Sequence, residues 1–207
     1  MRALIIVDVQ NDFLPDGALA VPEGDRIVPV INALIPEFDV VVATKDWHPP
    51  DHGSFAASHK GKKVGDVIDL NGLEQILWPV HCVQGTPGAE LSKDLIRDGI
   101  QEIFTKGTDP EIDSYSGFFD NGHRRSTGLA DYLKARQVEG VYVTGLAADY
   151  CVKYTTLDSR KEHFKTYLFK DATRAVNLQP DDFRKAIREM KDNGVKILNS
   201  TDFLKES

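Results

Sequence analysis

Short apolar runs without polar alternation recur along the chain, and stretches of helical spacing separate them. Residues 2–9 (RALIIVDV) and 40–44 (VVVAT) are continuous runs rich in Ile and Val, and each is short enough to be a buried strand. Similar runs predict strands at 102–105, 140–144, 166–170 and 195–198. Strands buried on both faces lack polar alternation, so the pattern predicts a parallel sheet covered by helices on both sides.

Apolar residues at helical spacing predict the helices between these strands. Residues 27–38 show this spacing, and further helices are expected at 90–97, 127–136, 150–162 and 181–192. Pro180 begins the last of these and Gly194 ends it. The repeated β-α-β order predicts a doubly wound α/β fold: a six-stranded, mainly parallel sheet with right-handed crossovers. We expect a single domain that spans residues 1–207.

Composition narrows the class of protein. The chain has 207 residues, 41% hydrophobic and 28% charged, which suits one globular domain with a substantial core. Its net charge of -7 argues against a nucleic-acid or anionic-membrane surface. No apolar run approaches the roughly 20 residues that span a bilayer. The two cysteines, Cys82 and Cys151, could form at most one disulfide, unlike a secreted scaffold. A soluble cytoplasmic protein is the expectation.

The longest region without a predicted element is residues 45–88, which holds much of the Pro and Gly in the chain. Loops of this length inside a compact domain are commonly functional. In its middle part, residues 60–76, charged and apolar residues alternate. We expect that part to shape the mouth of a pocket or a dimer contact.

Chemically reactive side chains follow four of the predicted strands. Asp8 follows the first, Asp46 the second, Lys106 the third, and Cys151 comes shortly after the fourth, in TGLAADYCV. The carboxyl ends of parallel strands share one edge of a sheet, where ligands bind in open α/β folds. A carboxylate, an amine and a thiol at that edge would make a nucleophilic site.

Cys151 is the candidate nucleophile. It lies where a predicted helix begins, and a helix N-terminus lowers the pKa of a thiol from about 8.5. Backbone N–H groups of residues 145–148 could hold an oxyanion beside the sulfur. Lys106 could stabilise the thiolate and Asp8 could accept its proton. Each also has a plainer interpretation: a buried small residue for Cys151, a turn cap for Asp8 and a solvated strand end for Lys106.

The loop after the second strand carries candidate metal ligands. Asp46 and His48 are two residues apart and can point the same way from an extended segment. His52, His59 and His81 follow, and one carboxylate with imidazoles suits zinc, iron or manganese. No tight zinc-ligand spacing appears, and surface positions are the plainer expectation for His52 and His59. His123 and His163 are expected at the surface.

Taken together, these stretches resemble the nicotinamidase branch of the isochorismatase-like cysteine hydrolases. The blocks that carry the resemblance run in family order across most of the chain: ALIIVDVQNDF (3–13), TKDWHPPDHGSF (44–55), WPVHCVQGTPGAEL (78–91), FTKG (104–107), YSGF (115–118) and GLAADYCV (145–152). Residues 60–76 match no signature of that family.

The resemblance implies roles for individual residues. It implies a triad of Asp8, Lys106 and Cys151, and an oxyanion hole formed by the backbone N–H groups of Ala147 and Cys151. It also implies a cis peptide between Leu146 and Ala147. It implies that Phe13, Trp78 and Tyr115 form aromatic walls around the pyridine ring of the substrate, with Leu146 as a further substrate-binding residue. It also implies that Asp46, His48 and His81 bind one divalent metal. His52 matches a position that is a ligand in only some members of the family.

The implied activity is metal-assisted hydrolysis of nicotinamide to nicotinate and ammonia through a thioester, in NAD salvage, with pyrazinamide as a second substrate. The implied metal is zinc, with iron and manganese as alternatives, and the implied assembly is a homo-oligomer, a dimer or larger. Three other interpretations stay open: another amidase of the family that acts on a different carboxamide or carbamoyl compound, a metal-water hydrolase with a structural Cys151, and a non-catalytic metal-binding domain.

Overall fold

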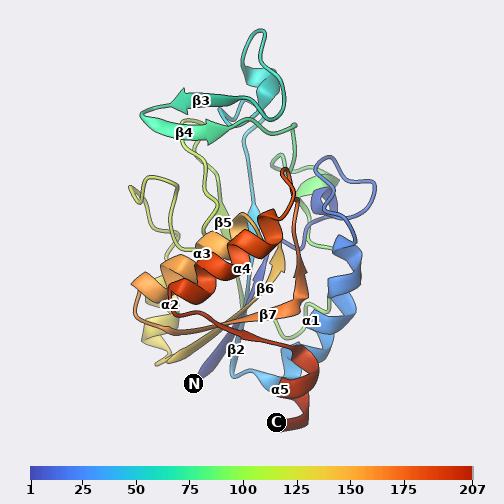
Figure 1. Cartoon of the computed structure of the whole chain (residues 1–207), viewed down its shortest axis with the longest axis vertical. Coiled ribbons are helices and arrows are strands. Elements are labelled where there is room, and N and C mark those ends of the chain that lie inside the picture. The colour runs from blue at the N-terminus through green and yellow to red at the C-terminus, as the bar shows by residue number, and fades with distance from the viewer. Residues whose placement is uncertain (207) are drawn as a thin grey trace.

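A six-stranded sheet forms the centre of the molecule in the computed structural model, which describes residues 1–206 (Figure 1). Its strands are β1 (Arg2–Val7), β2 (Val40–Asp46), β5 (Glu102–Lys106), β6 (Gly140–Leu146), β7 (Lys165–Arg174) and β8 (Lys196–Leu198). They lie in the order β5-β2-β1-β6-β7-β8, and every pairing is parallel. The predicted six-stranded parallel sheet is confirmed.

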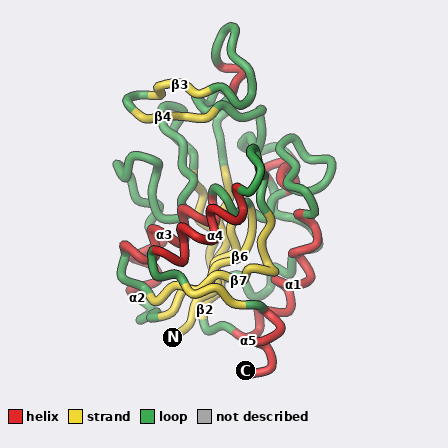
Figure 2. Tube along the Cα trace, viewed as in Figure 1, coloured by secondary structure: helices red, strands yellow, loops and turns green. Residues whose placement is uncertain are grey.

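Helices cover both faces of this sheet (Figure 2). On one side lie α1 (Val28–Leu34) and α5 (Ser200–Glu206), and on the other α2 (Leu129–Ala135), α3 (Cys151–Lys161) and α4 (Asp182–Asp192). Successive side chains of a strand point to opposite faces. Leu4 and Ile6 therefore join the core on the α1 side, whereas Ile5 and Val7 join the core under α2, α3 and α4. This two-sided burial explains why the strands are apolar throughout.

The order of the strands reverses beside β1. From β1 the chain builds outward through β2 and β5, and it then crosses to β6 on the other side of β1. Gly145 of β6 permits the close approach of β6 to β1, because a Cβ at this position would lie 2.0 Å from the carbonyl oxygen of Val7. Open α/β sheets bind ligands beyond the strand ends at such a reversal.

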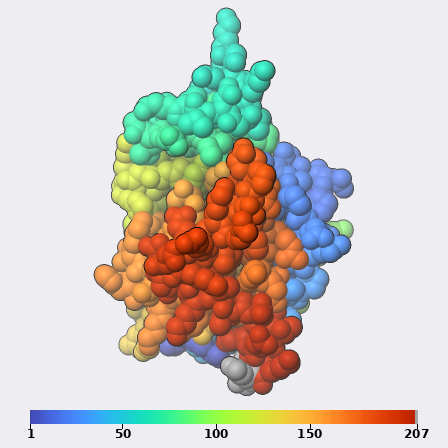
Figure 3. All heavy atoms as spheres, in the orientation of Figure 1, coloured from blue at the N-terminus to red at the C-terminus, as the bar shows by residue number. Residues whose placement is uncertain are grey.

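A two-stranded hairpin projects from the carboxyl end of the sheet (Figure 3). It consists of β3 (Val67–Leu70) and β4 (Leu73–Ile76), which pair antiparallel. The apolar pattern of the sequence predicts no strand here. A signal was present, because Asn71-Gly72 is a strong hairpin turn and both residues have positive φ, 51° and 84°.

The predicted helix at 90–97 is wrong, because tertiary contacts use the backbone groups that a helix would need. Glu90 accepts a hydrogen bond from the backbone of Asn11, and the Ser92 N–H donates to Val9. The Asn32 side chain bonds the backbone of Asp94 and of Ile96. The apolar spacing that suggested a helix reflects burial of two leucines in an irregular segment: Leu91 and Leu95.

Two other elements differ from prediction. β7 continues to Arg174, past the expected end at 170, and its pairing with β6 shifts register between Val143 and Gly145. The helix α5 was not predicted, and Asp171 of β7 accepts hydrogen bonds from the backbone and side chain of its first residue, Ser200. Within residues 1–206, no helix has both the length and the apolar character needed to cross a membrane.

Candidate active site and metal site

Asp8, Lys106 and Cys151 meet at the carboxyl edge of the sheet. The Lys106 Nζ lies 2.8 Å from the Asp8 carboxylate and 3.4 Å from the Cys151 sulfur. These side chains come from the ends of β1 and β5 and from the first residue of α3, and all are buried. The topology has therefore brought together three residues that are distant in sequence, and a buried, paired Lys106 is not a solvated strand end.

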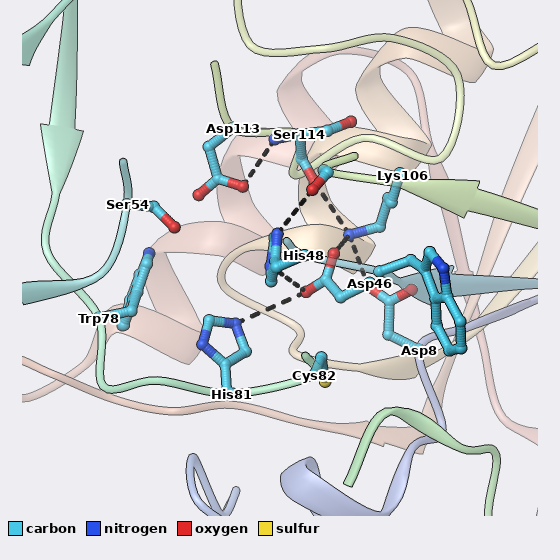
Figure 4. Close-up of polar contacts among 12 residues, drawn as sticks. Asp8, Asp46, His48, Ser54, Trp78, His81, Cys82, Lys106, Asp113 and Ser114 are labelled. Carbon is cyan, nitrogen blue, oxygen red and sulfur yellow. Dashed lines mark hydrogen bonds and ion pairs between the residues drawn. The ribbon is translucent and has the colours of Figure 1, made fainter. Parts of the chain in front are cut away.

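Local structure fixes the acid and the amine. Asp8 has a φ of 49°, a left-handed conformation that Asp tolerates better than most residues, and this turn ends β1. The Thr44 hydroxyl donates to the Asp8 carboxylate at 2.6 Å. Lys106 also donates to the carbonyl oxygen of Ser114 at 2.9 Å (Figure 4). Neither side chain has room to turn toward solvent.

Burial decides the resting charge of the thiol. It raises the pKa of Cys151 well above its usual value, and the opposing attraction of Lys106 does not reverse that. The sequence predicts that the helix N-terminus lowers the pKa of Cys151, whereas burial in the folded chain raises it. Burial also raises the pKa of Asp8, against the pull of Lys106. A protonated thiol thus faces a carboxylate of increased basicity.

Two backbone donors lie at the nucleophile. Among the hydrogen bonds of residues 1–206, the N–H groups of Ala147 and Cys151 have no acceptor, whereas those of Ala148, Tyr150 and Val152 bond to backbone carbonyls. The peptide between Leu146 and Ala147 is cis, as the family resemblance implied. Free N–H groups beside a nucleophile are suited to bind an oxyanion.

Asp46, His48 and His81 form a buried cluster next to these residues (Figure 4). One Asp46 oxygen lies 3.7 Å from His48 Nε2 and 3.8 Å from His81 Nε2. The other oxygen accepts from Lys106 at 2.5 Å. Burial alone would raise the pKa of Asp46, but Lys106 and then His48 hold it well below its usual value. Asp46 is therefore a carboxylate shared between the cluster and the lysine.

The imidazoles of this cluster are oriented by backbone carbonyls. His48 Nδ1 lies 2.8 Å from the Gly107 oxygen, and His81 Nδ1 lies 2.8 Å from the Pro79 oxygen. Gly107 is required, because a Cβ there would come within 2.4 Å of the His48 ring. Carbonyls only accept, so each Nδ1 carries the proton and each Nε2 presents a lone pair. One carboxylate and two such nitrogens fit a divalent metal such as zinc.

The remaining histidines divide into one buried residue and three nearer the surface. His52 is buried with its ring 4.3 Å from that of His48, so the surface interpretation is wrong for it. It lies in a second cluster with His48 and Asp113, outside the Asp46 cluster. His59 is half-buried and bonds the Gly53 oxygen. The exposed positions predicted for two others are confirmed: His123 and His163.

A cavity that is partly open to solvent joins the nucleophile to the metal cluster. Of the residues predicted to contact substrate, Phe13, Trp78 and Tyr115 line it. Leu146 does not, because its side chain is fully buried in the core on the α1 side. Sequence reasoning did not identify four further lining residues: Leu19, Asp113, Tyr150 and Val176.

Aromatic side chains make a rigid wall in this cavity. The Trp78 Nε1 donates to the Tyr115 hydroxyl at 3.1 Å, and the rings of Trp78 and Tyr150 meet edge to face with centroids 4.8 Å apart. Gln75 of β4 donates to the Tyr115 hydroxyl and to Asp113, each at 3.1 Å. Residues 60–76 thus support the pocket through Gln75. Tyr150 was identifiable in principle, since it directly precedes Cys151.

Comparison with known proteins gives a consistent result. The isochorismatase domain model matches residues 2–202. The nicotinamidase of Escherichia coli K12 is 46% identical over 98% of this chain and 96% of its own length. A solved nicotinamidase/pyrazinamidase structure from Acinetobacter baumannii superposes with a TM-score of 0.95 at 46% identity, covering 98% of this chain and 97% of that one.

A second solved structure, the pyrazinamidase of Pyrococcus horikoshii in complex with zinc, gives a TM-score of 0.78 at 42% identity. It covers 96% of this chain and 98% of that one. Sequence and structure therefore agree over nearly the whole length, and the chain belongs to the isochorismatase domain family.

Proposed function

We propose that this chain is a nicotinamidase, a metal-assisted cysteine hydrolase that converts nicotinamide to nicotinate and ammonia. The observation that carries the proposal is the Cys151 thiol, in contact with Lys106 and beside Asp8, at the floor of an aromatic cavity that also contains the Asp46 cluster. The E. coli and A. baumannii proteins named above, with their near-complete coverage, support the same activity.

In the proposed reaction Asp8 takes the proton of the Cys151 thiol, and the sulfur attacks the carboxamide carbon. The N–H groups of Ala147 and Cys151 hold the tetrahedral oxyanion. Asp8 returns its proton to the departing ammonia, and a thioester forms. Asp8 then activates a water that releases nicotinate and restores the thiol. Lys106 stays charged throughout, because burial is outweighed by Asp46 and Asp8, which raise its pKa well above the usual value.

The ring is positioned by the walls of the cavity and by the metal cluster. Phe13, Trp78 and Tyr150 offer apolar faces of the size that an aromatic heterocycle fills. A divalent metal held by Asp46, His48 and His81 would bind the pyridine nitrogen and so fix the orientation of the ring. Orientation of this kind lowers the barrier by removing rotational freedom before the attack.

Further properties belong to the same proposal. Zinc is the proposed metal, supported by the zinc complex of the P. horikoshii protein. Pyrazinamide is proposed as a second substrate, and NAD salvage as the pathway. We also propose one catalytic domain over residues 1–207, a cytoplasmic location, and a homo-oligomer, for which light scattering on the purified chain gives the mass directly.

The test is release of ammonia from nicotinamide by wild type and by Cys151→Ala. We expect the variant to lose at least about 10³-fold in kcat, because no other thiol lies at the carboxamide. Cys82→Ala is the matched control: it removes the other buried sulfur, which contacts neither Asp8 nor Lys106 through a hydrogen bond or ion pair among residues 1–206. Wild-type turnover by Cys151→Ala would refute the assignment.

A further inference from the structure

The histidines at the metal cluster differ in the hydrogen-bond partner of Nδ1. For His48 and His81 that partner is a backbone carbonyl, so Nδ1 donates and Nε2 is free to coordinate. For His52 the partner is the backbone N–H of Ser54, at 3.1 Å. An N–H can only donate, so the Nδ1 of His52 must accept. The Ser54 hydroxyl, at 2.7 Å, then donates to the same nitrogen.

This pattern fixes the protonation of the His52 ring. A neutral imidazole carries one proton, and if Nδ1 accepts, the proton must be on Nε2. A nitrogen that carries a proton has no lone pair for a metal. Since Ser54 is only two residues along and its amide direction is set by the turn that contains Gly53, His52 cannot adopt the other tautomer without losing that bond.

The Nε2 of His52 is buried and has no hydrogen-bond partner within residues 1–206. A buried donor without an acceptor is unfavourable, so an acceptor is expected when the site is in use. The nitrogen and oxygen atoms of His48, His52 and Asp113 lie within 4.8 Å of one another. Asp113 and His48 line the cavity, and the fully buried His52 lies behind them.

We propose that His52 is not a metal ligand but a positioning residue, whose Nε2–H donates to a water oxygen held between it and the Asp113 carboxylate, beside His48. The His52 ring, held in this way, would position His48 by packing against it, since the two ring centroids lie 4.3 Å apart. Such outer-shell donors orient the ligands of a metal and tune its affinity. This inference rests on the metal site of the proposed function.

The first experiment reads the tautomer directly. Long-range proton–nitrogen NMR on the ¹⁵N-histidine-labelled chain, with and without zinc, separates protonated, lone-pair and metal-bound nitrogens. We expect His52 to keep a protonated Nε2 in both states, while the Nε2 signals of His48 and His81 shift when zinc binds. A zinc-dependent shift of His52 Nε2 without its proton would overturn the proposal.

The second experiment measures zinc affinity by competition with a chelator. His52→Gln keeps an N–H donor at a similar distance from the backbone, so we expect a Kd within about threefold of wild type, whereas His52→Leu should weaken it about tenfold. His81→Gln removes a ligand and should weaken it by more than about 100-fold. His59→Gln, in the same loop, serves as the control.

The outcomes separate this proposal from the function on which it rests. Loss of zinc by His52→Gln to the extent seen for His81→Gln would make His52 a ligand and overturn the inference. A wild-type chain that binds no zinc would instead overturn the metal role in the proposed function. In that case the zinc-free NMR spectrum alone still decides the tautomer of His52.

Discussion

Lys106 balances two carboxylates and a thiol in the buried interior of the candidate active site. Its ammonium contacts Asp8, Asp46 and Cys151, and the side chain is fully buried. Isolated burial of a charge is strongly unfavourable, so the cation and the carboxylates stabilise the folded chain only together. The same arrangement leaves Cys151 protonated at rest and Asp8 ready to accept its proton.

At this scale, replacement of Lys106 by Met should affect stability and activity together. The change leaves Asp8 and Asp46 buried without their cation, and breaking a buried pair typically costs about 3–5 kcal/mol. We expect a lower free energy of unfolding in urea and no detectable ammonia release. Lys153→Met is the matched control, because Lys153 pairs with the exposed Glu189 on the surface. An unchanged unfolding midpoint for Lys106→Met would contradict the account.

Gly107 carries a second prediction at the residue scale. An added Cβ would lie 2.4 Å from the His48 ring, so Gly107→Ala must displace the imidazole that the Gly107 carbonyl orients. We expect zinc affinity to fall about 10–100-fold, as for other losses of ligand orientation. Gly61→Ala is the control, since it shares a positive φ and its Cβ would meet nothing within 4 Å. Equal affinities in the two variants would argue against the role of Gly107.

At the scale of elements, the β3–β4 hairpin supports the pocket although it lies outside the central sheet. Gln75 is the buried residue of β4 that reaches the aromatic wall, through Tyr115 and Asp113. We expect Gln75→Ala to raise the KM for nicotinamide about 5- to 150-fold, the equivalent of about 1–3 kcal/mol for unsatisfied buried groups. Steady-state kinetics test this. Glu74→Ala, exposed on the same strand, should keep the wild-type KM.

For the whole molecule, metal binding should couple to folding. The cluster of Asp46, His48 and His81 joins the end of β2 to the loop that precedes residues 87–89, so a bound metal links segments that separate on unfolding. A ligand at 1,000 times its Kd stabilises the folded state by about 4 kcal/mol. Chelation should therefore lower Tm and abolish ammonia release, and zinc should restore both. In His81→Gln the chelator should leave Tm unchanged.

Sequence alone determined the sheet and the carboxyl edge at which chemistry gathers, because doubly buried strands need continuous apolar runs and parallel strands share one edge. Residues such as Asp8, Lys106 and Cys151 were therefore identifiable from their positions just after strands. The local signal misled at residues 90–97, where backbone groups bond to distant segments instead of to one another.

Only the tertiary structure decided what depends on the surroundings of a side chain. Burial set the pKa of Cys151 against the expectation from its helix position, and the backbone of Ser54 set the tautomer of His52. Gln75 entered the site because a hairpin folds over it. The charge of a side chain, the position of its proton and its contacts all depend on the residues around it. Those residues come from segments that are distant in the sequence, so a local sequence pattern does not predict them.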